Sequence, residues 1–116
     1  MVRTTAQEVA GHYNKMGIET APKRKIIYLL HEKCVHLLNR SIYDTEKRRY
    51  LLDRAQNIIV QLQSALIRED TVAESLYQLY DYAYARLENG GETDIANVQA
   101  IMRQLTDTYY VLLVYR

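Results

Sequence analysis

Four side chains that could take part in chemistry lie close together in the first half of the chain: His31, Glu32, Cys34 and His36. On a helix, Glu32 and His36 are four residues apart and share a face, so both could reach one metal ion. Two ligands do not complete a metal site, and neither the Glu-x-x-His spacing of di-iron bundles nor an H-E-x-x-H pattern is present. We therefore expect no metal and no other cofactor.

The same stretch is a weak candidate for covalent catalysis. His31 and Cys34 would lie on one helix, with no third group in evident reach to orient them. We interpret Cys34 as a small core residue, and the histidines and Glu32 as solvated side chains. No glycine-rich phosphate loop is present, so the sequence indicates a protein that is not an enzyme.

Two basic runs, 23–25 and 47–49, raise the question of nucleic-acid binding. The formal net charge of +1 gives no general attraction to nucleic acid or anionic lipid, and charge runs are usually solvated. Both runs fall in predicted first turns, where cations oppose the helix dipole, so their presence needs a reason. We expect no nucleic-acid partner.

The chain also lacks the patterns of a membrane or secreted protein. No apolar run approaches the ~20 residues that span a bilayer, and no apolar signal region begins the sequence. A single cysteine cannot form an internal disulfide. We expect a cytoplasmic protein without membrane insertion.

Tyrosine supplies every aromatic ring, with eleven in the chain and no Phe or Trp. Each buried hydroxyl needs a hydrogen-bond partner or water, so several tyrosines should lie at a solvated edge. In the stretch 73–88, helical spacing places Tyr80 on the core stripe and Tyr77 and Tyr84 at its edge. Such an edge is usually part of a core, but the excess of hydroxyls favours a protein-binding groove.

Apolar residues recur at helical spacing in four segments, about 20–41, 47–67, 71–88 and 93–115. Short polar turns separate the segments, which implies antiparallel neighbours. We predict an all-α fold, an antiparallel four-helix bundle over residues 20–116. Residues 1–19 would form an N-terminal arm or short helix that packs conditionally.

The first predicted helix has two apolar faces, which is more than one small bundle can bury. One face contains Ile26, Leu30, Cys34 and Leu37, with Ile27 and Leu38 beside it. The other, nearly opposite, contains Tyr28, Val35 and Ile42. The second must be covered by the N-terminal arm, by a fifth segment or by another protein.

Three motifs follow one another along most of the chain. Tyr13 and Ile18 precede a T-A-P start at 20–22, A-x-x-I-I-x-x-L spans 55–62, and L-Y-Q-L-Y-D-Y spans 76–82. In this order, the set resembles the flagellin-specific export chaperone family (FliS). The resemblance implies a cytoplasmic helical bundle that holds the disordered C-terminal region of flagellin, prevents premature polymerisation and keeps flagellin competent for flagellar type III export. It also implies export-apparatus components or a co-chaperone as further partners.

We expect the client to lie in a hydrophobic groove between the outer face of the first helix, the edge tyrosines and the N-terminal arm. The predicted groove residues are Tyr13, Ile18, Tyr28, Leu29, Val35, Ile42, Tyr77 and Tyr84. Tyr13 and Ile18 would cover the groove in the free protein, which we expect to be a monomer or weak homodimer. The alternative is a non-enzymatic helical adaptor or regulatory bundle that homodimerises through the same apolar patch.

Overall fold

The computed structural model describes residues 21–69 and 71–114. This part of the chain forms four helices, α2 (Ala21–Tyr43), α3 (Arg48–Ser64), α4 (Thr71–Asn89) and α5 (Glu92–Val114), and no strand. The predicted all-α, antiparallel four-helix bundle is confirmed. The predicted N-terminal arm, with Tyr13 and Ile18, lies outside the described residues, and the domain boundary at residue 20 stays a prediction.

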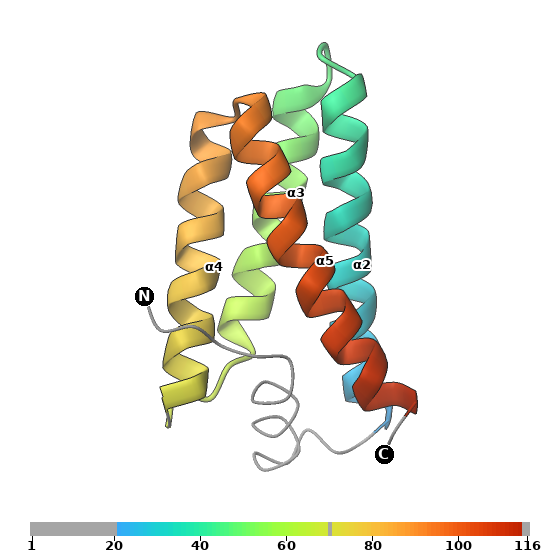
Figure 1. The fold of residues 1–116 in the computed structure, drawn as a ribbon, viewed down its shortest axis with the longest axis vertical. Helices are drawn as coiled ribbons and strands as arrows, with labels where there is room; N and C mark the ends of the chain where they lie inside the picture. The colour runs from blue at the N-terminus through green and yellow to red at the C-terminus, as the bar shows by residue number, and fades with distance from the viewer. Residues whose placement is uncertain (1–20, 70, 115–116) are drawn as a thin grey trace.

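The four helices stand side by side in chain order, and α5 closes the bundle against α2 (Figure 1). Each of α2 and α4 packs on both α3 and α5, so α2 and α4 lie diagonally across the bundle. Helix α5 leans, lying near α4 at its start and near α2 at its end (Figure 1). Residues on α2 and α4 therefore face different sides of the molecule.

The core receives apolar side chains from every helix. Its buried members are Ile27, Cys34, Leu37 and Leu38 of α2, Leu51, Leu52, Ala55, Ile58, Ile59 and Leu62 of α3, Leu76, Tyr80, Ala83 and Leu87 of α4, and Ile95, Val98, Met102, Leu105 and Tyr109 of α5. Burying each large aliphatic side chain contributes about 1.5 to 3 kcal/mol, so this cluster is the main source of stability.

The turn between α4 and α5 contains a glycine with a positive φ. Gly90 has a φ of 69°, the left-handed conformation that ends many helices. A Cβ at Gly90 would lie 3.1 Å from Leu52 Cδ1, so the position is restricted by packing as well. In the first turn of α4, the Glu74 carboxylate accepts two hydrogen bonds from Arg68 at 2.9 and 3.0 Å.

The second basic run has a structural reason, which corrects its interpretation as a solvated charge run. Arg48 donates hydrogen bonds to the carbonyls of Ser41 and Ile42 at 2.9 and 3.1 Å, in the last turn of α2. Arg49 donates to the Leu87 carbonyl at 3.0 Å, in the last turn of α4. The last carbonyls of a helix have no intrahelical partner and carry its negative dipole end. The two arginines at the start of α3 thus cap two other helices.

Candidate functional site

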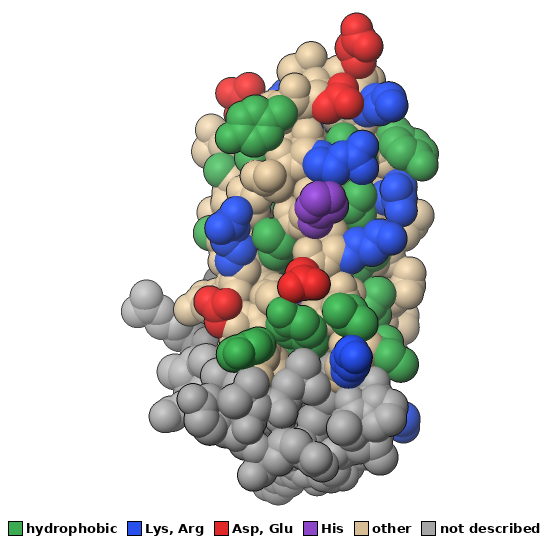
Figure 2. Space-filling model, turned by 90° about the vertical axis from the view of Figure 1, so that its right-hand side faces the viewer, with side chains coloured by type: hydrophobic (Ala, Val, Ile, Leu, Met, Phe, Trp, Pro, Cys, Tyr) green, Lys and Arg blue, Asp and Glu red, His purple; other side chains and the backbone are tan. Residues whose placement is uncertain are grey.

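The outer side of α2 carries apolar side chains that the bundle leaves exposed. Ile26 is 58% exposed and Leu29 is 44% exposed. Tyr110 of α5 is 54% exposed, and its ring centroid lies 6.2 Å from that of Tyr28. Figure 2 shows hydrophobic side chains gathered at the lower end of this side of the described bundle. We call the exposed side of α2, from Ile26 to His36, together with its borders on α3 and α5, the α2 face.

The core face predicted for the first helix is correct in part. Cys34 and Leu37 are buried, as are Ile27 and Leu38 beside them, but Ile26 was expected in the core and is exposed. Ile26 was misplaced because a polar residue, His31, occupies a core position, so the apolar pattern alone did not show which side of the helix points inward.

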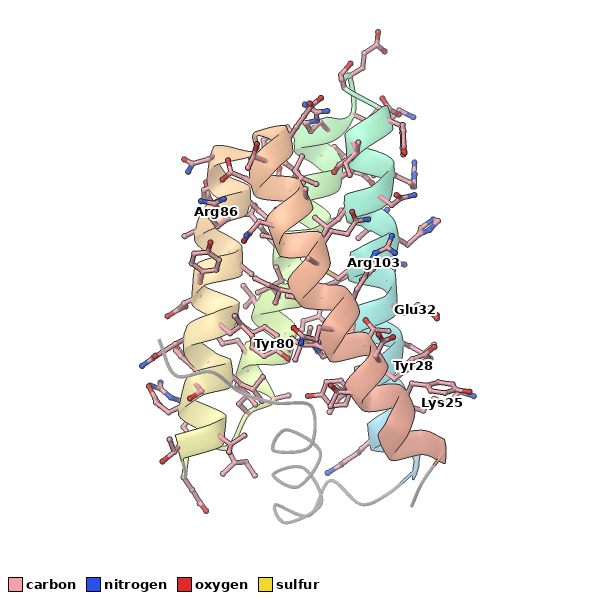
Figure 3. All side chains as sticks on the ribbon, in the orientation of Figure 1. Lys25, Tyr28, Glu32, Tyr80, Arg86 and Arg103 are labelled. Atoms are coloured by element: carbon pink, nitrogen blue, oxygen red, sulfur yellow. The ribbon has the colours of Figure 1, made fainter. Side chains whose placement is uncertain are left out.

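The predicted groove residues of α2 fall on or beside the α2 face. Tyr28, Val35 and Ile42 are half-buried and pack against the edge of the core, and Leu29 is exposed. The Tyr28 hydroxyl donates to the Glu32 carboxylate at 2.9 Å. Figure 3 shows Tyr28 and Glu32 on the outer side of the bundle. The second apolar stripe of α2 is thus only partly covered by the described residues.

Two surface hollows border the α2 face. The hollow between α2 and α5 has a volume of about 310 Å³ and is lined by Glu32, Val35, Arg103, Thr106 and Asp107. The hollow between α2 and α3 has a volume of about 280 Å³ and is lined by Leu30, Lys33, Arg54, Asn57, Ile58 and Gln61. Both are near or below the lower end of the ~300 to 1,000 Å³ range of small-molecule pockets, so they suit side chains of a docked segment better than a free ligand.

The two predicted groove residues on α4 lie away from the α2 face. Tyr77 is half-buried beneath the Arg68 guanidinium, whose central carbon is 3.6 Å from the ring centroid. Tyr84 is 37% exposed. Because α4 is diagonal to α2, the structure does not bring these tyrosines together with Tyr28 and Leu29 in one groove.

A row of polar side chains on α3 donates hydrogen bonds to α4. These contacts were not predicted from the sequence. Arg49, Gln56 and Gln63 are seven residues apart on α3 and face α4 in turn. Gln56 donates to the Tyr84 carbonyl at 3.1 Å, and Gln63 donates to the Tyr77 carbonyl at 3.1 Å. Gln56 is only 4% exposed, and these hydrogen bonds satisfy its buried amide. The seven-residue spacing was the available signal.

His31 lies in the centre of the bundle, which corrects its interpretation as a solvated side chain. Its Nδ1 donates to the Ile27 carbonyl at 2.9 Å, so its Nε2 accepts a hydrogen bond from the Tyr80 hydroxyl at 2.8 Å. The Tyr109 ring stacks on the imidazole with centroids 4.6 Å apart. Burial lowers the pKa of His31 to about 4, although the Ile27 hydrogen bond opposes this change. A neutral imidazole therefore joins α2, α4 and α5, with Tyr80 on the inner side (Figure 3).

The other candidates for chemistry do not form a reactive site. Burial raises the pKa of the Cys34 thiol to about 12, so the reactive thiolate is absent at neutral pH. Across the described parts of the chain, no group of three or more His, Cys, Asp or Glu side chains could hold a metal ion. No helix in these parts is both long and apolar enough to cross a membrane. The exposed apolar surface of the α2 face is therefore the candidate functional site.

The chain is similar in sequence to known proteins of one family. A family described as "Flagellar protein FliS" matches residues 5–112. A curated relative, "Flagellar secretion chaperone FliS" from Bacillus subtilis (strain 168), is 29% identical over 80 residues. That match covers 65% of this chain and 60% of the length of the relative. No solved structure matches the chain.

Proposed function

Because the chain belongs to the flagellar protein FliS family, we propose that it is a non-enzymatic flagellar export chaperone that binds the disordered C-terminal region of flagellin on the α2 face. The name of the Bacillus subtilis relative, a flagellar secretion chaperone, supports this proposal. Binding in the cytoplasm would prevent flagellin from polymerising early and keep it competent for type III export. Export-apparatus components or a co-chaperone would be further partners.

The observation that carries the proposal is the apolar surface of α2 that the bundle does not bury. Ile26 and Leu29 are exposed on α2, and the half-buried Tyr28 continues their surface toward Tyr110 of α5. An amphipathic segment can place its apolar side chains on such a helix face and between neighbouring helices. The α2 face offers a rigid template on which a disordered client would fold.

The cost of ordering the client keeps such a complex reversible. Ordering a disordered segment on binding costs about 2 to 5 kcal/mol of the gross interaction energy. An export chaperone must release its client, and this ordering cost lowers affinity without removing contacts. Tyr77 and Tyr84 stay predicted contacts, and a client that touches them as well must extend around the bundle from α2 to α4.

A pair of matched substitutions tests the proposal. Leu29 on α2 and Val60 on α3 are both 44% exposed, so their replacement by serine removes apolar groups of similar exposure. We expect Leu29→Ser to weaken binding of a flagellin C-terminal peptide by roughly tenfold in isothermal titration calorimetry, since anchor residues carry much of the binding energy. Val60→Ser should leave the affinity unchanged.

The homodimer alternative gives a different result in the same samples. Light scattering coupled to size-exclusion chromatography, with and without the peptide, measures the mass of the particle. A stable dimer that ignores the peptide, and that Leu29→Ser dissociates, would contradict the chaperone proposal and favour self-association through the α2 face.

A further inference from the structure

The hollow between α2 and α3 combines apolar and cationic groups. Leu30 and Ile58 supply its apolar surface, Lys33 extends from α2, and Arg54 extends from α3. None of its lining residues is acidic. A segment that filled this hollow would meet two positive charges beside an apolar surface.

These two cations have no ionic partner within the described chain. Several other arginines in the bundle are paired, as in Arg49 with Asp53 at 2.9 Å and Arg86 with Asp94 at 3.0 Å, although no ion pair is seen for Arg40 or Arg103 among the described residues. For Arg54, the contact seen is with the Tyr50 ring, whose centroid is 5.8 Å from the guanidinium carbon. Arg54 is half-buried, and a guanidinium in this position can bind a carboxylate through two parallel hydrogen bonds.

The opposite border of the α2 face has a different charge. The hollow between α2 and α5 carries the carboxylates of Glu32 and Asp107 together with Arg103. Figure 2 shows this difference, with Lys and Arg side chains along the right-hand side of the α2 face, whereas its middle and left carry acidic side chains together with a cationic one. A helix that lies on the α2 face would therefore meet only cations along its edge toward α3, and carboxylates together with Arg103 along its edge toward α5.

We propose that the α2 face selects an amphipathic helical segment whose edge toward α3 carries Asp or Glu residues that pair with Lys33 and Arg54. This inference rests on the proposed function, in which a client binds the α2 face. It specifies in addition which charges the bound segment must carry. The apolar stripe of the segment covers Leu29 and enters the hollow at Leu30. The two carboxylate contacts fix the rotation and register of the segment, as charged pairs do at protein interfaces.

A peptide fits this surface better than a nucleic acid does. The hollow contains the apolar side chains of Leu30 and Ile58, and Glu32 lies next to Lys33 on the exposed side of α2. A continuous polyanion would meet the Glu32 carboxylate, and the net charge of the chain is only +1. Isolated carboxylates on an apolar helix avoid that repulsion.

Two synthetic amphipathic peptides test the proposal on the full chain. They share their apolar positions and differ only in carrying Glu or Lys along one edge. By fluorescence anisotropy we expect the Glu peptide to bind roughly tenfold more tightly, with a preference that decreases as salt screens the charges. The double variant K33E/R54E should reverse the preference, and R103E at the other border should not weaken the Glu peptide.

The neutral variant K33Q/R54Q, checked for an unchanged melting temperature, should remove the preference without reversing it. Equal affinity of the wild-type chain for both peptides would overturn the proposal. Tighter binding of a single-stranded RNA than of the Glu peptide would also overturn the proposal, if K33E/R54E abolished that binding, because Lys33 and Arg54 would then form a nucleic-acid site.

A flagellin C-terminal peptide separates this inference from the proposed function. If that peptide binds the wild-type chain and K33E/R54E equally, the charge selection is wrong and the proposed function stands. If it binds neither, while the Glu peptide binds through Lys33 and Arg54, the proposed client is wrong and the charge selection stands.

Discussion

Acidification should destabilise this protein through His31. The imidazole is fully buried, Tyr80 donates to its Nε2 at 2.8 Å, and Tyr109 stacks on its ring. Protonation would place a second N–H against the Tyr80 hydroxyl and a positive charge in the core.

The size and direction of the effect follow from the pKa of His31. An ordinary histidine has a pKa of 6.5, and burial lowers that of His31 to about 4 in the folded state. Between these two pH values the unfolded chain binds a proton that the folded chain does not. The contribution of neutral His31 to the free energy of unfolding is therefore fully present above pH 6.5 and decreases as the pH falls toward 4. A difference of about 2.5 pH units, at about 1.4 kcal/mol each, corresponds to about 3.5 kcal/mol in total, of which about 3 kcal/mol is lost by pH 4, where His31 is half protonated in the folded state.

Urea unfolding at a series of pH values from about 7.5 to about 4 measures this loss. Wild type and His31→Gln share every other titratable group, so the difference between their two stability curves isolates His31. His31→Gln should lose about 3 kcal/mol less over this range, whatever its stability at neutral pH. His36→Gln, at an exposed position on α2, is the matched control and should follow the wild-type curve. Parallel curves for wild type and His31→Gln would refute the idea of a neutral buried imidazole.

Three further substitutions test the contacts that hold the bundle together, each by urea unfolding at pH 7. Tyr80→Phe leaves His31 without its donor and should cost about 1 to 3 kcal/mol; an unchanged midpoint would contradict this role. Arg49→Gln removes the cap of α4 and should cost about 1 to 2 kcal/mol, whereas Arg40→Gln, exposed in the last turn of α2, loses only an interaction with the helix dipole that salt screens and should cost less than about 0.5 kcal/mol. Gly90→Ala should cost about 1 to 2 kcal/mol because an L-residue is strained at a φ of 69°; a neutral effect would mean that the turn relaxes.

The helices could be predicted because the spacing of apolar residues that indicates a helix depends only on residues close together in the sequence. Helical spacing placed Tyr80 on the core stripe, and Cys34 was correctly interpreted as a core residue, since both are fully buried. His31 was misplaced because nothing in its neighbourhood shows that Tyr80, far along the chain, supplies a hydrogen bond in the core.

The candidate site was predicted only in part, since it depends on which helices are neighbours. The α2 residues Tyr28 and Leu29 were identified from their position outside the core stripe. Arg54 and Tyr110 were missed because α3 and α5 border α2 only after the bundle closes. The same diagonal arrangement places Tyr84 on another side of the molecule, a separation that helical periodicity cannot show.

Site-specific photo-crosslinking to flagellin tests most directly whether the α2 face holds the client. A photoreactive residue placed singly at Leu29, Val60 or Tyr84 reports which surface touches the flagellin C-terminal region in the complex. We predict strong crosslinks from position 29 and none from position 60, with position 84 reporting whether the client extends around to α4. Crosslinks from position 60 or 84 without any from position 29 would contradict binding on the α2 face.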